Sequence, residues 1–280
     1  MQKYSIFNLI KNAFSNHQKW DLAWKDPTPK KEYDVVIIGG GGHGLATAYY
    51  LAKEHNITNV AIIEKGWIGG GNVGRNTTII RSNYMHDDNA LFSEFGMDLW
   101  RKMSQDLNYN VMFSPRGIIN LAHSDAQMNV YARRGNSMRL NGIDAELLNR
   151  EQVREIIPMA DFSENVRFPI FGGLMQPSAG TARHDAVAWG YARQADSMGV
   201  DIIQNCEVIG FDISGGKVEG VRTSRGDIKV KKVGLCVAGS TNILADKLNM
   251  TLPVETHLLQ ACVSEPVKPV LDKVVTFGAG

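Results

Sequence analysis

Residues 33–44 read YDVVIIGGGGHG, and this stretch decides the fold class. The short apolar run 34–38 is typical of a strand buried on both faces of a parallel sheet. Glycines end the run, and residues 45–54 (LATAYYLAKE) then place apolar side chains at helical spacing. Residues 59–64 (NVAIIE) predict a second buried strand. Together these segments predict a βαβ unit with a right-handed crossover.

The glycines between the first strand and the helix form a dinucleotide-binding motif. Gly39, Gly41 and Gly44 satisfy the spacing G-x-G-x-x-G, and Glu64 ends the second strand twenty residues after Gly44. The first glycine makes the tight turn, the second lets backbone amides approach a pyrophosphate, and the third allows close packing of helix and strand. We expect Glu64 to accept hydrogen bonds from ribose hydroxyls, and its charge disfavours the 2′-phosphate of NADP.

A second glycine-rich loop favours FAD over NAD. After Glu64 come Lys65, Gly66 and Trp67, then the glycines at 69–71 and the donor-rich residues 72–78. A nicotinamide enzyme has little use for such a loop, whereas a cofactor that extends to a flavin ring needs one. Residues 234–239 (GLCVAG) add a late strand ending at Ala238 and Gly239, whose backbone could approach the cofactor beside the first strand.

Composition excludes several classes of protein. The 280 residues carry 30 Lys and Arg against 29 Asp and Glu, so no charge excess is available to bind nucleic acid. Three cysteines without a C-x-x-C pair indicate neither a disulfide framework nor a metal site, and we expect a cytoplasmic location. Without an apolar run of ~18 residues or a signal peptide, no membrane span or export signal is expected.

The rest of the chain repeats the alternation of helix and strand. A helix is predicted over 185–198, β-segments over 200–204, 206–211, 218–223 and 229–237, and strand and turn material of another character over 113–121 and 175–181. The fold class is therefore α/β (α+β overall), with a Rossmann-type FAD-binding domain built on a parallel sheet and a substrate domain built on a mixed or antiparallel sheet. The expected divisions are an N-terminal extension (1–30), an FAD-binding βαβ segment (31–110), a substrate-domain segment (111–184), a return to the FAD-binding domain (185–250) and the start of a second substrate-domain segment (251–280).

Four runs of sequence resemble a known family. They are residues 33–67, 70–84 (GGNVGRNTTIIRSNY), 180–208 (GTARHDAVAWGYARQADSMGVDIIQNCEV) and 220–226 (GVRTSRG). The chain resembles the beta subunits of heterotetrameric sarcosine oxidases, within the D-amino-acid-oxidase-like flavoprotein superfamily, over about residues 20–264. The resemblance implies that FAD, bound noncovalently, oxidises sarcosine to glycine and a one-carbon unit. It further implies that electrons pass from FAD to a covalent FMN and then to oxygen, giving hydrogen peroxide, and that alpha, gamma and delta subunits are partners.

The resemblance also assigns individual residues. His184 falls on the position that carries FMN at the contact with the alpha subunit. Without the resemblance, the surrounding sequence would favour a simpler role for His184, that of forming local hydrogen bonds before a helix. Arg81 is the candidate for pairing with the substrate carboxylate, and Arg75 is expected to contact the cofactor or to stabilise the loop. The alternative is that both arginines are solvated surface residues. The full set of expected FAD-binding residues is Gly39, Gly41, Gly42, Gly44, Glu64, Lys65, Asn72, Arg75, Asn76, Thr77, Ile79, Val208 and Gly239.

Two departures from the family matter. Members continue beyond the equivalent of Gly280, so we expect the chain to be truncated at its C-terminus. Monomeric relatives have an arginine where Thr78 stands and attach FAD to a C-terminal cysteine that this chain does not reach. Two other functions stay open: an FAD dehydrogenase or oxidase of another secondary or D-amino acid without FMN, and a non-catalytic FAD-holding scaffold subunit. The residues identify no catalytic base and do not fix which N-methyl amino acid is preferred.

Overall fold

The βαβ unit expected from residues 33–64 forms the centre of a six-stranded sheet. A computed structural model describes residues 5–163 and 165–277. In it, β1 (Glu32–Ile38), α2 (Gly42–His55) and β2 (Val60–Ile63) follow one another, and the two strands pair in parallel. The buried run at the end of β1 continues directly into the glycine turn that starts the helix.

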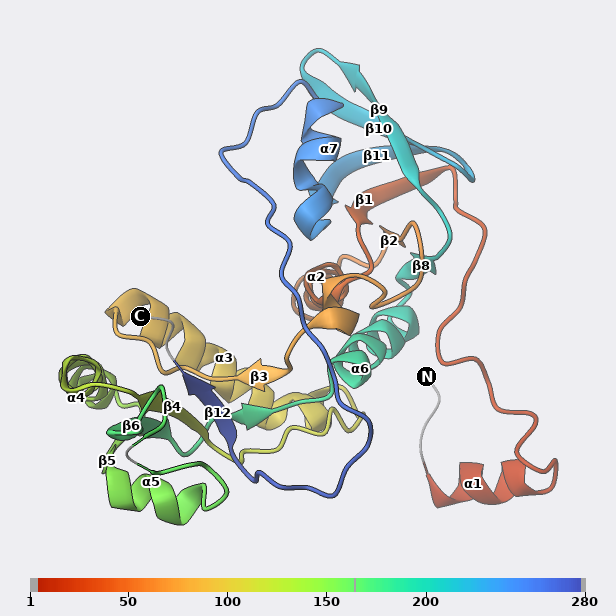
Figure 1. Cartoon of the computed structure of the whole chain (residues 1–280). Coiled ribbons are helices and arrows are strands. Elements are labelled where there is room, and N and C mark those ends of the chain that lie inside the picture. The colour runs from red at the N-terminus through yellow and green to blue at the C-terminus, as the bar shows by residue number, and fades with distance from the viewer. Residues whose placement is uncertain (1–4, 164, 278–280) are drawn as a thin grey trace. The chain divides into compact units, whose positions relative to one another are not determined.

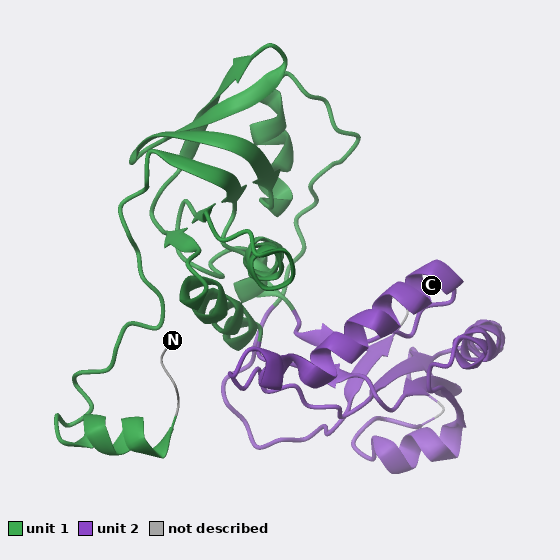
Figure 2. Ribbon diagram, turned by 180° about the vertical axis from the view of Figure 1, so that it is seen from behind, with its two compact units in different colours: residues 1–76, 184–261 green, residues 77–183, 262–280 purple. Residues whose placement is uncertain are grey.

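The chain divides into two compact units, which Figure 2 shows in different colours. Unit 1 comprises residues 1–76 and 184–261, and unit 2 comprises residues 77–183 and 262–280. Each unit therefore consists of two segments that are far apart in the sequence.

The sheet of unit 1 is parallel on one side and antiparallel on the other. Its strand order is β8-β2-β1-β11-β10-β9. The first four of these strands run parallel, and β10 and β9 continue from β11 as an antiparallel meander. The added strands are β8 (Asp201–Ile203), β9 (Val208–Ser214), β10 (Lys217–Thr223) and β11 (Gly226–Leu235).

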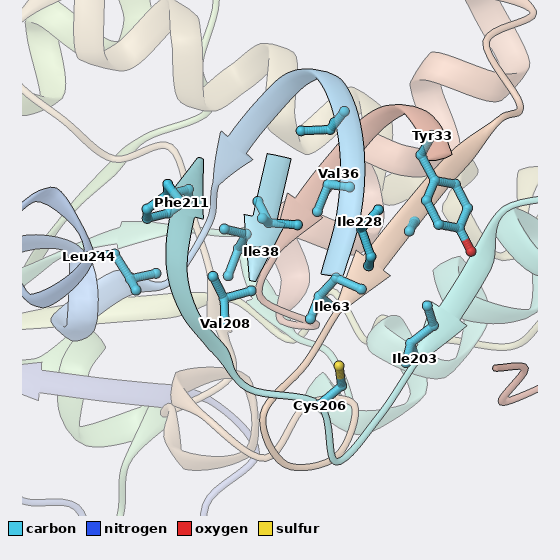
Figure 3. Close-up of a cluster of buried hydrophobic side chains, with 13 residues drawn as sticks. Tyr33, Val36, Ile38, Ile63, Ile203, Cys206, Val208, Phe211, Ile228 and Leu244 are labelled. Carbon is cyan, nitrogen blue, oxygen red and sulfur yellow. The ribbon is translucent and has the colours of Figure 1, made fainter. Parts of the chain in front are cut away.

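Alternating side chains of these strands form the core of unit 1. Val36 and Ile38 of β1 and Ile63 of β2 point into one cluster, shown in Figure 3, together with Leu244 of α7 (Thr241–Asp246). α6 (His184–Ser197) packs against α2, with the rings of Tyr49 and Tyr191 5.3 Å apart. A strand with both faces covered by side chains is what the continuous apolar run 34–38 predicts.

Before β1, the chain forms α1 (Ile6–Ala13) and an extended segment. Asp26 anchors that segment: its Oδ1 accepts hydrogen bonds from the Gln204 amide at 3.1 Å and from Arg225 Nη1 at 3.2 Å.

Unit 2 is built on a four-stranded mixed sheet with the order β12-β4-β6-β5. β4 pairs in parallel with β12 and antiparallel with β6, and β5 completes the antiparallel side. Separate buried clusters involve side chains of α5, such as Val153, and of α4, such as Met138. The elements, labelled in Figure 1, are β3 (Ile79–Ile80), α3 (Asp87–Asp106), β4 (Ile118–Ala122), α4 (Asp125–Leu140), β5 (Glu146–Asn149), α5 (Arg150–Ile156), β6 (Gly172–Gln176), β7 (Gly180–Thr181) and β12 (Val274–Phe277).

The expected fold class is confirmed: unit 1 has four parallel strands extended by two antiparallel ones, and unit 2 has a smaller mixed sheet. One expected strand end is wrong: β11 ends at Leu235, and Ala238–Ser240 form a 3-10 turn (η2) in which Ala238 has a φ of +46°. The units also divide differently from the expected segments, because residues 77–110 group with unit 2 and residues 251–261 with unit 1. No helix of the described residues is both long and apolar enough to cross a bilayer.

Candidate cofactor and substrate sites

Close backbone packing explains two of the motif glycines. Gly39 follows β1 with a φ of +111°, and a Cβ there would lie 2.3 Å from the carbonyl oxygen of Cys236, just beyond β11. A Cβ on Gly44 would lie 2.0 Å from the carbonyl oxygen of Gly39. Both positions therefore require glycine for the turn and for the packing of α2 on β1, as the motif predicts.

Gly41 and Gly42 differ, because the chain itself leaves room beside them. A Cβ on either residue would contact only the Val73 side chain, at 3.8 Å and 3.4 Å. Gly41 is the N-cap of α2 and provides no side-chain cap. The first amides of the helix are thus exposed to an incoming group in the arrangement that binds phosphate at helix N-termini.

Glu64 lies immediately after β2 and is held by two backbone amides. Its Oε2 accepts from Gly40 at 2.7 Å, and its Oε1 accepts from Gly66 at 2.8 Å. Each carboxylate oxygen keeps a further acceptor position. The fixed carboxylate can therefore accept hydrogen bonds from a ribose diol, the role expected of it.

The second glycine-rich loop is bonded to the first one. The Gly69 amide donates to the carbonyl oxygen of Gly40 at 3.1 Å, and Val73 of η1 (Asn72–Arg75) lies beside Gly41 and Gly42. Within η1, Asn72 and Arg75 are exposed. Asn76 Nδ2 donates to the Val73 carbonyl at 2.7 Å and thereby closes the turn.

Three other expected FAD-binding residues of unit 1 lie at different places. Lys65 is exposed between Glu64 and Gly66. Val208 opens β9 and is buried in the core, two residues after Cys206, whose amide donates to the Glu64 carbonyl at 2.9 Å. Gly239 lies in η2 and not in a strand, and its carbonyl accepts from Thr256 Oγ1 at 3.2 Å. Their contacts with FAD stay predictions.

His184 is the first residue of α6. Its Nδ1 is buried and makes no hydrogen bond to any part of the chain that the structure describes. A buried polar nitrogen without a partner is unfavourable and calls for an explanation, such as strain, an ordered water or a catalytic role. No group of the described residues therefore occupies this nitrogen.

In unit 2, Arg81 lines a pocket of about 480 Å³. The guanidinium Cζ lies 4.6 Å from the ring centroid of Tyr84. The pocket brings together both ends of the unit's sequence: its lining residues are Thr77, Ile79, Arg81, Tyr84, Asn120, Thr276 and Phe277. Thr77 and Ile79, which were expected to contact FAD, thus lie in the same pocket as the candidate substrate residue.

A hydrogen-bonded chain of amides supports this pocket. Arg81 Nη1 donates to Oδ1 of the fully buried Asn83, whose Nδ2 donates to Asn120 Oδ1 at 2.7 Å. Asn120 Nδ2 donates in turn to Thr276 Oγ1 at 2.6 Å. The side chains of β4 and β12 that face the pocket are thereby fixed in their orientation.

A second arginine lies beside the pocket, next to the residues that line it. Arg134 of α4 donates from Nε and Nη2 to the carbonyl oxygen of Asn83. Burial, and next the nearby charge of Arg81, hold the pKa of Arg134 below its usual value. Neither Arg81 nor Arg134 forms an ion pair among the residues that the structure describes. Such a region attracts an anion.

Sequence analysis singled out Arg81, which lines this pocket, but not the residues around it. Asn83 and Tyr84 stand within the run RSNY, which carried the family resemblance, so a signal for them was present. Asn120, Arg134 and Thr276 are separated from that run by long stretches of chain and had no such signal. Gly40 was also missed as the donor to Glu64, because it occupies a variable position of the motif.

Comparison with known proteins gives a consistent result. The family model described as FAD dependent oxidoreductase matches residues 34–278. The chain is 59% identical over 278 residues to sarcosine oxidase subunit beta of Rhizobium meliloti, covering 99% of the chain and 67% of that relative. It is 51% identical to the protein of the same name from Rhodobacter capsulatus, covering 98% of the chain and 66% of that relative. The chain thus spans about two thirds of the length of these relatives.

Solved structures show the same fold. L-proline dehydrogenase from P. horikoshii superposes with a TM-score of 0.77 at 24% identity, covering 89% of the chain and 65% of that structure. Glycine oxidase from Bacillus cereus superposes with a TM-score of 0.66 at 25% identity, covering 76% of the chain and 57% of that structure.

Proposed function

The chain belongs to the family of FAD-dependent oxidoreductases, and from this premise we propose that it is the FAD-binding, sarcosine-oxidising subunit of a heteromeric oxidase. The observation that carries the proposal is the 59% identity to a sarcosine oxidase subunit beta across 99% of the chain. In this proposal unit 1 binds FAD and unit 2 binds the substrate. These are the roles that the sequence predicts for the two domains.

The residues of unit 1 fit FAD. The Gly41 and Gly42 backbone leaves space beside the uncapped start of α2 for the pyrophosphate, and Glu64 accepts hydrogen bonds from the adenosine ribose. The glycine-rich loop at 69–71 and the polar residues Asn72, Arg75 and Asn76 provide further donors beside this cradle. When bound, FAD supplies the two-electron acceptor that takes a hydride equivalent from the N-methyl carbon of the substrate.

The pocket of unit 2 fits a small amino acid. Arg81 pairs with the substrate carboxylate, and the Tyr84 ring and Asn83 hold the guanidinium in place. Fixing the carboxylate orients the N-methyl group, which is the contribution that positioning makes to such a reaction. Because hydride transfer requires the neutral amine but no obligatory side-chain base, we assign no catalytic base. The products are glycine and an imine-derived one-carbon unit.

We also propose His184 as the covalent attachment site of FMN. The buried and unbonded Nδ1 of this residue supports the assignment, since a ring nitrogen engaged elsewhere in the chain would be a poor nucleophile. FMN, when attached, supplies the step from FAD to oxygen that forms hydrogen peroxide. We further propose that the chain assembles with alpha, gamma and delta subunits and that FMN lies at the contact with the alpha subunit. The proposed location of the complex is the cytoplasm.

Flavin loading and reduction test the proposal. The subunit, expressed from its complete coding region and loaded with FAD, should lose its visible flavin absorption when sarcosine is added without oxygen. Flavin colour that remains with the denatured polypeptide, and that is lost in His184→Ala, would support the FMN assignment. Bleaching by D-amino acids or proline but not by sarcosine would favour another amine substrate. Bound flavin that no amine reduces would favour a scaffold subunit.

A further inference from the structure

Arg134 is the charged side chain beside the pocket of unit 2 that the proposed function leaves without a role. It lies on α4, far along the chain from the RSNY run, and is partly buried. It does not line the pocket itself. Burying a guanidinium next to another one costs free energy, so the arrangement calls for an explanation.

The contacts of Arg134 converge on one residue. Its Nε and Nη2 both donate to the carbonyl oxygen of Asn83, so two hydrogen bonds hold the backbone at that position. Asn83 is fully buried. A lysine at position 134 could not reproduce this planar, two-donor contact.

The side chain of Asn83 then connects two of the polar residues that line the pocket, Arg81 and Asn120. Its Oδ1 accepts from Arg81 Nη1, and its Nδ2 donates to Asn120 Oδ1 at 2.7 Å. Because an amide has one acceptor side and one donor side, both contacts hold only while Asn83 keeps this orientation. Fixing the Asn83 backbone therefore fixes Arg81 and Asn120 relative to each other.

We propose that Arg134 is a positioning residue: by holding the carbonyl of Asn83, it sets Arg81 and Asn120 to receive the carboxylate of a ligand in the pocket. The nature of the ligand rests on the proposed function, whereas the coupling between Arg134 and Asn83 does not. Arg134 adds a second positive charge behind the first one, which strengthens the preference for an anion over a neutral molecule of the same shape.

The test combines a probe of the pocket with turnover. Acetate is titrated into the wild-type subunit while the side-chain amide NMR signals of Asn83 and Asn120 are followed, with neutral acetamide as the comparison ligand. In Arg134→Gln, we expect both signals to shift without ligand and the acetate Kd to rise roughly tenfold. Arg134→Lys should recover part of the affinity, because it keeps the charge but loses the two-donor contact. Arg133→Gln, the exposed neighbour on the same helix, is the matched control and should behave as wild type.

A double-mutant cycle locates the effect. If Arg134 acts through Asn83, the losses of acetate-binding free energy in Arg134→Gln and Asn83→Ala should be strongly non-additive. In the FAD-loaded enzyme, Arg134→Gln should raise KM for sarcosine while kcat stays within about twofold, which a general loss of structure would not produce.

Several outcomes would overturn the inference. These are acetate affinity in Arg134→Gln within about twofold of wild type, additive losses in the cycle, or no acetate binding by the wild-type protein. If Arg134→Gln fails to fold, Arg134→Lys decides, and wild-type affinity in that variant would refute the positioning role. Acetate binding that depends on Arg134, in an enzyme that does not oxidise sarcosine, would instead refute the proposed function and leave this inference standing.

Discussion

The amide of Gly40 donates a 2.7 Å hydrogen bond to Oε2 of Glu64, twenty-four residues further along the chain. Oε1 of the same carboxylate accepts from Gly66. Glu64 therefore links the first glycine-rich loop to the residues that lead into the second one, in addition to its proposed contact with ribose. A Cβ on Gly40 would lie 3.0 Å from the Cβ of Glu64, so the bond also depends on the missing side chain.

Replacing Glu64 by glutamine should lower both the stability of the fold and the affinity for FAD. A glutamine amide offers one acceptor oxygen where the carboxylate has two, so one of the two loop amides then faces an NH₂ group. We expect a loss of about 1–3 kcal/mol in unfolding free energy. The FAD Kd, measured by flavin fluorescence quenching, should rise about tenfold or more. Glu54→Gln, at the exposed end of α2, is the control and should change neither quantity.

Two glycine substitutions should separate folding from cofactor binding. Gly39→Ala places a Cβ 2.3 Å from the Cys236 carbonyl oxygen at a φ of +111°. It should lower the free energy of unfolding, measured by urea titration, by more than about 1 kcal/mol. Gly41→Ala meets only Val73 at 3.8 Å, so it should fold normally. Because its methyl group points to the proposed pyrophosphate site, its FAD affinity should fall. Equal FAD affinity in Gly41→Ala and wild type would contradict this placement.

Replacing Arg81 by glutamine should affect sarcosine binding more than folding. Losing a charge-assisted pair of hydrogen bonds costs about 1.5–3 kcal/mol, which corresponds to a KM increase of roughly 10- to 100-fold. Steady-state kinetics of the FAD-loaded enzyme measures this change, and Arg133→Gln provides the control. An unchanged KM would remove Arg81 from the substrate site.

The three cysteines should react in an order set by exposure. Cys262 is exposed, Cys236 is partly buried and Cys206 is fully buried. Burial raises the pKa of the Cys236 thiol, so less thiolate is present at neutral pH. Under native conditions, mass spectrometry should detect alkylation of Cys262 first, Cys236 more slowly, and Cys206 only after unfolding. The rate at Cys236 should still increase with pH above its ordinary pKa of about 9.

Tyr33 should make the stability of the chain fall at alkaline pH. Its hydroxyl donates to Asp201 Oδ2 at 2.8 Å and accepts from the Lys30 amide at 3.1 Å. Burial raises its pKa well above the ordinary value of 10.0, so the folded state keeps the proton that the unfolded state releases. The contribution of Tyr33 is therefore complete below about pH 10 and is lost as the pH rises further.

Tyr33→Phe should cost about 1 kcal/mol at neutral pH and reduce this alkaline loss. Urea titrations across the pH range measure both effects, with Tyr50→Phe on α2 as the control. An alkaline loss of the same size in Tyr33→Phe would show that other groups cause it.

The local elements could be predicted because their signals lie close together in the chain. The buried run before Gly39, the helical spacing after Gly44 and the acid at position 64 are features of one short segment, and the structure places them in β1, α2 and the end of β2. The end of β11 could not be predicted in this way. The run 234–239 is apolar enough for a strand, but Ala238 adopts a positive φ and the chain turns.

The sequence by itself determined the βαβ unit, the glycine turn and the family, since periodicity and fixed spacing encode them locally. Only the tertiary structure decided that residues 77–110 group with unit 2, that Gly40 binds Glu64, and that Arg134 grips Asn83. Asn120 and Thr276 are 156 residues apart, yet they bond because β4 and β12 pair in one register. Such contacts depend on how strands and helices pack, and no local pattern of residues specifies that packing.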